Sequence, residues 1–264
     1  MNRMRLVRPM VLVALLTMTC TAHAQTADRD MLYQVSTLDA LLAGVFDPVT
    51  TIGDLLTHGD TGLGCFAAVD GEMVVLDGKA YQVRSDGKVL RATPAMRSPF
   101  AVVTCFDRDR EMKLDQPLDL KGLTAFLDAQ LPTRNLFYVI RLDGDFDYMK
   151  SRSVPRQHKP YPRLLAVSMA QAMFEFKQTR GTLIGIFCPY FVTGANMAGW
   201  HFHYLNDERT GGGHVLDLKL KQGTLAIDQT PRYMMALPES GPYTEVRLEK
   251  TNVDEMHKVE QDRK

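Results

Sequence analysis

Three histidines near the C-terminus have the residue type and the spacing of a metal site. They lie in the segment GWHFHYLNDERTGGGHVLDLKL, which runs from Gly199 to Leu220. Side chains alternate between the two faces of a β-strand, so His201 and His203 share one face. The polar, glycine-rich run that follows predicts a hairpin loop, and His214 begins the returning strand. Three imidazoles on one hairpin predict an open metal site with a position left for water or substrate.

Two other interpretations of this segment remain. In the first interpretation, these are ordinary surface histidines. Against it, three of the seven histidines fall within this one hairpin, and two of them have the spacing of residues on one strand face. A cupin-like oxygenase or isomerase would add a carboxylate ligand at Glu208 and would favour iron. Against it, the later glycine of the cupin pattern is misplaced and the second cupin motif is absent from the sequence. The spacing therefore favours a metal site made of the three histidines.

The elements that must position this hairpin are mostly short strands. A hydroxyl three residues before an acid, at Ser36 to Asp39 and at Thr51 to Asp54, is the capping-box spacing and predicts two brief helices. From Leu63 to Ala92 the hydrophobic period is two, and Asp-Gly pairs at 70, 77 and 86 interrupt it. Because Asp-Gly suits type I′ turns, this stretch predicts an antiparallel meander.

Further strands are expected on both sides of one helix. Residues 99–106 predict a strand and residues 120–130 a helix, followed by a second hairpin of 136–142 and 146–153 that turns at Asp143-Gly144. Residues 172–177 and 183–189 predict strands, although the first could be helical, and the tail from Asn252 predicts a helix. The fold class is therefore α+β, dominated by antiparallel sheets and barrel-like meanders with a few short helices.

The N-terminus predicts a secretory signal peptide. Residues 1–24 combine a basic start, an apolar run from Val11 to Met18 and the small-x-small site Ala22-His23-Ala24. No small residue precedes Cys20, so lipidation is the less favoured alternative. We expect export to the periplasm or the medium. The three prolines within 154–163 predict a boundary between an N-terminal subdomain, 25–160, and a C-terminal subdomain, 161–264, although both could form one compact unit.

Charge and cysteine usage exclude some function classes. The chain carries 31 basic and 31 acidic residues, and the leader holds three of the arginines and no acid, so the mature chain is slightly acidic. Without a basic patch, neither nucleic acid nor an anionic membrane surface is an expected partner. Cys65, Cys105 and Cys188 each lie in an apolar run. They predict buried thiols rather than a disulfide framework.

Several stretches of the chain together are typical of one family. From about Leu32 to about Glu260, the chain resembles the acetolactate decarboxylase family in the order and spacing of its motifs. The motifs that carry the resemblance are LYQVSTLDALLAGVFD, TTIGDLLTHGDTGLGCF, DGEMVVLDG, SPFAVVT, SRSVPRQ and GWHFHYLNDERTGGGHVLD. A departure stands at Cys65, because family members usually have threonine after Gly-Leu-Gly. A hydroxyl role at this position would be lost or weakened to that of a thiol.

The resemblance implies a set of site residues and partners. It implies that His201, His203 and His214 bind Zn²⁺ or another divalent metal and that a homodimer forms. It also implies that Glu72 and Arg152 line the site, and that a glutamate of the C-terminal tail completes it. We assign that last role to Glu260, with Glu255 as the alternative. A non-catalytic binding module with a similar histidine hairpin would lack the motifs around Glu72 and Arg152.

The implied reaction is the conversion of 2-acetolactate to acetoin and carbon dioxide. Loss of carbon dioxide from this β-keto acid leaves electrons on an enediolate, which a Lewis-acid metal stabilises. A carboxylic acid, Glu72 or Glu260, would then deliver a proton to one face. Arg152 would bind the substrate carboxylate or the developing oxygen anion. No organic cofactor is required, and the sequence contains no Gly-rich phosphate motif.

Overall fold

The computed structural model describes residues 28–248 and 253–260. The predicted signal peptide lies outside the described residues. In the last helix, the side chains of 254, 255, 258 and 259 are described and that of Glu260 is not. Among the described helices, none is long and apolar enough to cross a membrane.

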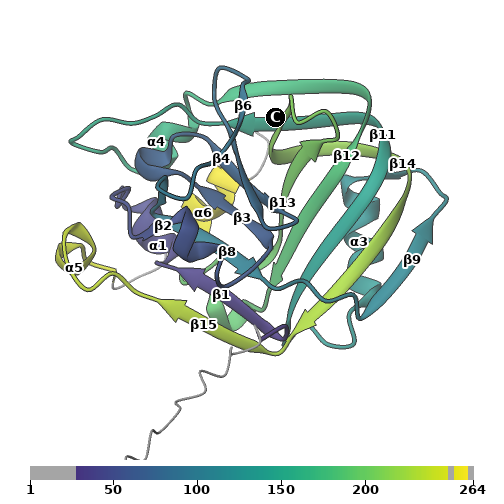
Figure 1. Cartoon of the computed structure of the whole chain (residues 1–264), viewed down its shortest axis with the longest axis horizontal. Coiled ribbons are helices and arrows are strands. Elements are labelled where there is room, and N and C mark those ends of the chain that lie inside the picture. Colours follow the sequence, from purple (N-terminus) through teal and green to yellow (C-terminus); the bar gives the residue numbers. More distant parts are fainter. Residues whose placement is uncertain (1–27, 249–252, 261–264) are drawn as a thin grey trace, which may run out of the picture.

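Two β-sheets form most of the molecule (Figure 1). The seven-stranded sheet, here called the meander sheet, contains the predicted meander and is completed by strands from both ends of the chain. Its strands, in spatial order, are β15 (Arg232–Ala236), β1 (Met31–Val35), β8 (Phe100–Thr104), β3 (Thr61–Cys65), β4 (Glu72–Leu76), β5 (Lys79–Val83) and β6 (Val89–Arg91). Strands β1 and β15 run parallel, and the other neighbours run antiparallel.

The six-stranded sheet, here called the histidine sheet, carries the histidine hairpin. Its order is β10 (Leu118–Asp119), β14 (Gly212–Thr230), β11 (Phe137–Ser153), β12 (Ala172–Cys188) and β13 (Gly199–Asn206), and β9 (Arg110–Leu114) also pairs with β14. Strand β13 pairs with β14 as well as with β12. Four strands therefore close on one another at the histidine end, which is the barrel-like feature of the fold. A separate pair consists of β2 (Thr50–Thr51) and β7 (Arg97–Ser98).

Short helices flank the two sheets (Figure 1). They are α1 (Leu38–Leu42), α2 (Ile52–Leu55), α3 (Leu120–Gln130), α4 (Leu164–Ser168), α5 (Pro242–Glu245) and α6 (Val253–Glu260), with 3₁₀ turns at Ala67–Val69 and Tyr190–Val192. Residues of α1, α4 and α6 belong to the apolar cluster that both sheets share. Thr51 caps α2 as predicted, because its hydroxyl accepts a hydrogen bond from the Asp54 amide at 3.0 Å. At α1 the cap is Thr37 rather than Ser36. The α+β class dominated by antiparallel strands is confirmed.

One predicted hairpin is wrong. Asp143-Gly144 does not turn the chain, because β11 is a single strand of 17 residues that pairs with β12 and β14 along its length. Gly144 lies opposite Gly181 and Gly223 on these neighbours. A Cβ on Gly144 would lie 2.8 Å from the Gln222 carbonyl oxygen, so close approach of strands, and not a turn, requires the glycine here.

The Asp-Gly pair of the meander that joins β4 to β5 behaves as predicted. Asp77 and Gly78 both have positive φ, 51° and 68°, as a type I′ turn requires. The proline-rich segment 154–163 follows β11 and precedes α4, while β11 and β12 on either side of it are neighbours in one sheet. The division into subdomains at this segment stays a prediction.

The core between the two sheets is apolar and leads directly to the histidines. Leu63, Phe100 and Val102 of the meander sheet pack with Phe137 and Ile186 of the histidine sheet. On the far side of the histidine sheet, α3 packs Leu123 and Leu127 against the strands (Figure 1). The sheets are thus held as layers, and the histidine hairpin lies where they meet.

Candidate metal centre

The predicted histidine hairpin is present and well fixed. His203 on β13 pairs directly with His214 on β14. Asn206 holds the loop between the strands, because its side-chain oxygen accepts hydrogen bonds from the amides of Thr210 and Gly211 at 2.8 and 3.0 Å. Gly213 has a φ of 123°, and a Cβ there would lie 2.4 Å from the Arg152 carbonyl oxygen. Glycine at this position therefore brings His214 close to β11.

The three imidazoles converge on one point. One ring nitrogen from each of His201, His203 and His214 lies within 4.8 Å of the others, and in the described part of the chain this is the group that could hold a metal ion. Nε2 of His201 lies 2.9 Å from Nδ1 of His214. Two of these histidines lie on β13 and the third on its hairpin partner β14, as the spacing of the histidines in the sequence predicted.

His203 has the tautomer that a metal ligand needs. Its Nδ1 lies 2.7 Å from the carbonyl oxygen of Met73 on β4, so Nδ1 carries the proton and donates it. Its Nε2 is buried, and within residues 28–248 and 253–260 no hydrogen-bond partner reaches it. An orphaned buried nitrogen is costly unless an ion or water satisfies it. The hydrogen bond to Met73 is the outer-shell contact that commonly orients a metal-bound imidazole.

The electrostatics of the site keep the imidazoles of His201 and His203 neutral. Burial, and then the charge of Arg152, lowers the pKa of His201 to about 3. Burial, the neighbouring His201 and Arg152 also hold the pKa of His203 well below its ordinary value, against the opposing hydrogen bond to Met73. Neutral imidazole is the form that binds a metal ion. Three converging imidazoles would leave a fourth position open and fit a catalytic divalent ion such as zinc.

Glu72 and Arg152 reach the same point from different sheets. Glu72 begins β4 of the meander sheet, and Arg152 lies on β11 of the histidine sheet, directly opposite His214. One Glu72 oxygen lies 3.6 Å from Nε2 of His203, and the other lies 3.7 Å from Nη1 of Arg152. Both side chains are buried. The structure thus brings together the histidines and these two residues, which are far apart in the sequence.

A small cavity of about 40 Å³ opens onto these groups. Its polar walls are Glu72, Arg152, His201 and His203, and Cys65 lies beside Glu72 on the neighbouring strand. The remaining walls are mostly apolar. They are formed by Leu38, Leu41, Gly64, Val69, Phe100, Val154 and Leu164. A largely apolar cavity of this size, with a few converging polar groups, suits a small molecule rather than a polymer.

The C-terminal helix closes one side of the site. Val259 of α6 is buried in the same apolar cluster as the cavity-lining residues Leu38 and Leu41. Glu255 is also buried, but its two oxygens accept hydrogen bonds from Nε and Nη2 of Arg163 at 3.0 and 2.6 Å. Glu260 ends the helix directly after Val259, and its side chain lies outside the described residues. The tail folds back against the cavity wall, as expected.

Other residues singled out in the sequence take different places. Glu208 is exposed in the hairpin loop and does not belong to the histidine group, so the cupin-like ligand set is not formed. Cys65, Cys105 and Cys188 form no disulfide bonds with one another, as predicted. Sequence reasoning missed the Met73 carbonyl and the Ser151 hydroxyl, which donates to the Gly212 carbonyl at 2.6 Å and ties the hairpin to β11. A backbone contact leaves no signal in a sequence.

Several known proteins are similar to this chain in both sequence and fold. The sequence profile of the family described as alpha-acetolactate decarboxylase matches residues 32–250. The alpha-acetolactate decarboxylase of Methanosarcina mazei is 45% identical over 231 residues, 88% of this chain and 80% of that protein. The same enzyme of Klebsiella aerogenes is 40% identical over 224 residues, 85% of this chain and 86% of that protein. The crystal structure of alpha-acetolactate decarboxylase from Bacillus subtilis strain 168 matches with a TM-score of 0.86 and 33% identity, covering 88% of this chain and 100% of that one.

Proposed function

Because this chain belongs to the alpha-acetolactate decarboxylase family and converts acetolactate to acetoin, we propose that it does so with a divalent metal ion at its histidine hairpin. His201, His203 and His214 would hold the ion, and zinc is the ion that three imidazoles fit best. The observation that carries the proposal is the buried Nε2 of His203, which has no hydrogen-bond partner among the described residues and faces two further imidazoles.

The bound ion would supply Lewis acidity to the substrate ketone and hydroxyl as the bond to the carboxylate breaks. In that step the electron pair of the broken carbon–carbon bond passes toward the ketone oxygen, and carbon dioxide leaves. Arg152 is buried beside His214, so its guanidinium acts without competition from water. It would bind the substrate carboxylate or the developing oxygen anion, and only the second contact accelerates the reaction directly.

The enediolate that remains needs one proton at carbon to become acetoin. Glu72 is buried, lies 3.7 Å from Arg152 and faces the cavity, so we assign it as the donor or as the group that orients the substrate hydroxyl. Glu260 would take the other of these two roles from the end of α6. Because each group is fixed on one side of the cavity, protonation on one face would give a single enantiomer of acetoin.

The apolar walls support the same chemistry. They exclude water from the charged groups, which strengthens the electrostatic contacts and prevents unspecific protonation of the enediolate. Cys65 lies among these walls beside Glu72 and would add only a weakly polar thiol to the site.

The decisive experiment is acetoin formation from racemic acetolactate by the purified mature protein. We expect activity that disappears after chelation and returns when zinc is added, with one metal ion bound per chain. Metal-free protein that keeps full activity would contradict the metal proposal. A folded, zinc-loaded protein that binds acetolactate without releasing acetoin would instead support the binding-module alternative.

We also propose export and dimer formation. The basic, then apolar, then small-residue pattern of residues 1–24 supports cleavage after Ala24 and release into the periplasm or the medium. The mass of the N-terminal peptide tests this, because an intact Met1 on the exported protein would contradict cleavage. A homodimer follows from the family resemblance, and light scattering of the purified protein would contradict it by giving the mass of one chain.

A further inference from the structure

Strand β4, which carries Glu72, lies across the histidine sheet and touches it at three places. Its first, third and fifth residues, Glu72, Val74 and Leu76, share the face that points to that sheet. Glu72 enters the cavity, while Val74 and Leu76 pack with Ile184 of β12 and Leu205 of β13. The position of β4 on the histidine sheet therefore decides where the Glu72 carboxylate lies.

On the histidine sheet, the residues that face β4 include a row of residues paired across neighbouring strands. Arg141 on β11 pairs with Ile184 on β12, and Ile184 pairs with His203 on β13. At one end of the row the His203 ring donates to the Met73 carbonyl. At the other end Nη1 of Arg141 donates to Asp77, the residue directly after β4, at 2.6 Å. The strand is thus tied at both ends along a row that includes a candidate metal ligand.

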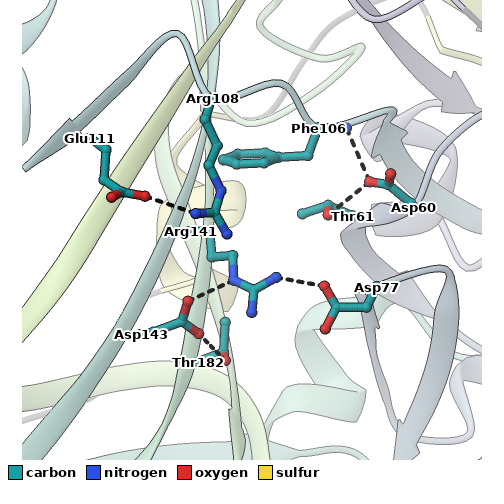
Figure 2. A network of polar contacts seen from close by, with 9 residues as sticks. All are labelled: Asp60, Thr61, Asp77, Phe106, Arg108, Glu111, Arg141, Asp143 and Thr182. Carbon is teal, nitrogen blue, oxygen red and sulfur yellow. Dashed lines mark hydrogen bonds and ion pairs between the residues drawn. The ribbon is translucent and has the colours of Figure 1, made fainter.

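Arg141 is itself held firmly (Figure 2). Its Nε donates to Asp143 at 2.7 Å, and Thr182 donates to the other oxygen of Asp143 at 2.6 Å. The Arg141 side chain is only 19% exposed. Burial alone would lower the pKa of Arg141, but the hydrogen bonds and charges of Asp143 and Asp77 raise it, so the group stays charged. Figure 2 shows the guanidinium bridging the Asp77 turn of one sheet and the strands of the other.

We propose that Arg141 is a positioning residue for the decarboxylation, because its bridge between Asp143 and Asp77 holds β4 in place and so sets Glu72 against His203. The inference rests on the proposed role of Glu72. The Glu72 carboxylate lies 3.6 Å from Nε2 of His203 and 3.7 Å from Nη1 of Arg152, and the place of β4 on the histidine sheet sets both distances. A displacement of about 1 Å at a reacting centre can lower the rate by two orders of magnitude.

The test compares Arg141→Met, Arg141→Lys and Asp77→Asn at saturating zinc. Lysine keeps the charge, but its single nitrogen cannot reproduce the two bonds of the bridge. We expect kcat to fall about tenfold in each variant, within the range that such displacements cause, with KM and bound zinc unchanged. We also expect acetoin of lower enantiomeric purity, because a displaced Glu72 delivers its proton less selectively. A double variant of Arg141→Met and Asp77→Asn should be no worse than either single variant.

Arg108→Met is the matched control. Arg108 forms a similar ion pair with Glu111 at 2.8 Å, also drawn in Figure 2, but the two side chains are 56% and 48% exposed and this ion pair does not include Asp77 or Asp143. We expect wild-type kcat and enantiomeric purity from this variant. If Arg141→Met fails to fold, Asp77→Asn, whose side chain is 60% exposed, carries the same test.

Two results would overturn the inference. One is wild-type kcat and enantiomeric purity in the Arg141 and Asp77 variants. The other is a loss of activity that follows a loss of thermal stability while the enantiomeric purity stays unchanged, since this indicates a purely structural role. Glu72→Gln distinguishes a failure of the Arg141 proposal from a failure of the proposed function. A fully active Glu72→Gln enzyme would contradict the role of Glu72 itself.

Discussion

Replacing Glu72 by glutamine tests the proposed chemistry most directly. The amide has nearly the same shape as the carboxyl group and keeps an oxygen, but it cannot deliver a proton as an acid. General acid catalysis by a positioned side chain contributes about 10² to 10⁴-fold. At about 1.36 kcal/mol per tenfold, this corresponds to roughly 3 to 5 kcal/mol of transition-state stabilisation. We therefore expect kcat to fall by two to four orders of magnitude.

The surroundings of Glu72 predict that the variant folds and binds metal. The Glu72 carboxylate lies 3.7 Å from the Arg152 guanidinium, and the glutamine oxygen can face the same guanidinium. The imidazoles and the Met73 contact that orients His203 do not change. We expect a normal zinc content and a melting temperature within a few degrees of the wild type, since about 1 kcal/mol shifts Tm by roughly 2–4 °C in a chain of this size.

The assay is steady-state acetoin production with zinc content measured on the same sample. Glu111→Gln is the control, because Glu111 forms an exposed ion pair with Arg108, and such pairs contribute about 0–1 kcal/mol to stability. Its activity should equal that of the wild type. A zinc-loaded Glu72→Gln enzyme with more than about a tenth of wild-type kcat would refute the reasoning and move the proton donor to Glu260.

Three further predictions concern stability and metal binding. Burial is the main cause that raises the pKa of Asp228 to about 7, so the folded protein loses stability as pH rises from about 4 to about 7. Asp228→Asn should remove up to about 4 kcal/mol of this loss. An equal change of Tm with pH in the wild type and in Asp228→Asn would contradict this prediction. Chelation should lower Tm by about 10 °C if free zinc is a thousandfold above Kd, and calorimetry before and after zinc restoration measures this. Gly213→Ala should cost at least about 1–3 kcal/mol in urea unfolding, because its Cβ would meet the Arg152 carbonyl at 2.4 Å. Gly78→Ala, also at positive φ but with no atom of the described residues within 4 Å of the added Cβ, should cost less, and equal losses of stability in the two variants would disprove the steric cause.

The parts of the site that one hairpin supplies were predictable from local spacing. His201 and His203 share a strand face because strand side chains alternate, and the glycine-rich loop returns His214 beside them. The family resemblance, and not periodicity, selected Glu72 and Arg152, and the structure brings both within 4 Å of each other. Without the fold, a glutamate after a turn and an arginine on a strand are indistinguishable from solvated residues.

Contacts between distant strands could not be predicted. The sequence pattern of Asp143-Gly144 is the same whether the glycine turns the chain or lets two strands approach closely, and only the neighbours Gly181 and Gly223 decide between these outcomes. The bond from His203 to the Met73 carbonyl also depends on how the two sheets pack. Local pattern determines elements, whereas the register between elements is a property of the whole chain.

The parallel pairing of β1 with β15 has a consequence for when the protein can fold. The first described strand has only β8 and β15 as neighbours in its sheet, and β15 is made near the end of the chain. On a ribosome, the N-terminal sheet must therefore wait for nearly the whole polypeptide before its edge is complete. Contacts so distant in sequence form slowly, because the entropy of closing a long loop opposes them. For a chain that we propose is exported, this delay would lengthen the time during which the polypeptide is still unfolded and can be translocated in an extended form.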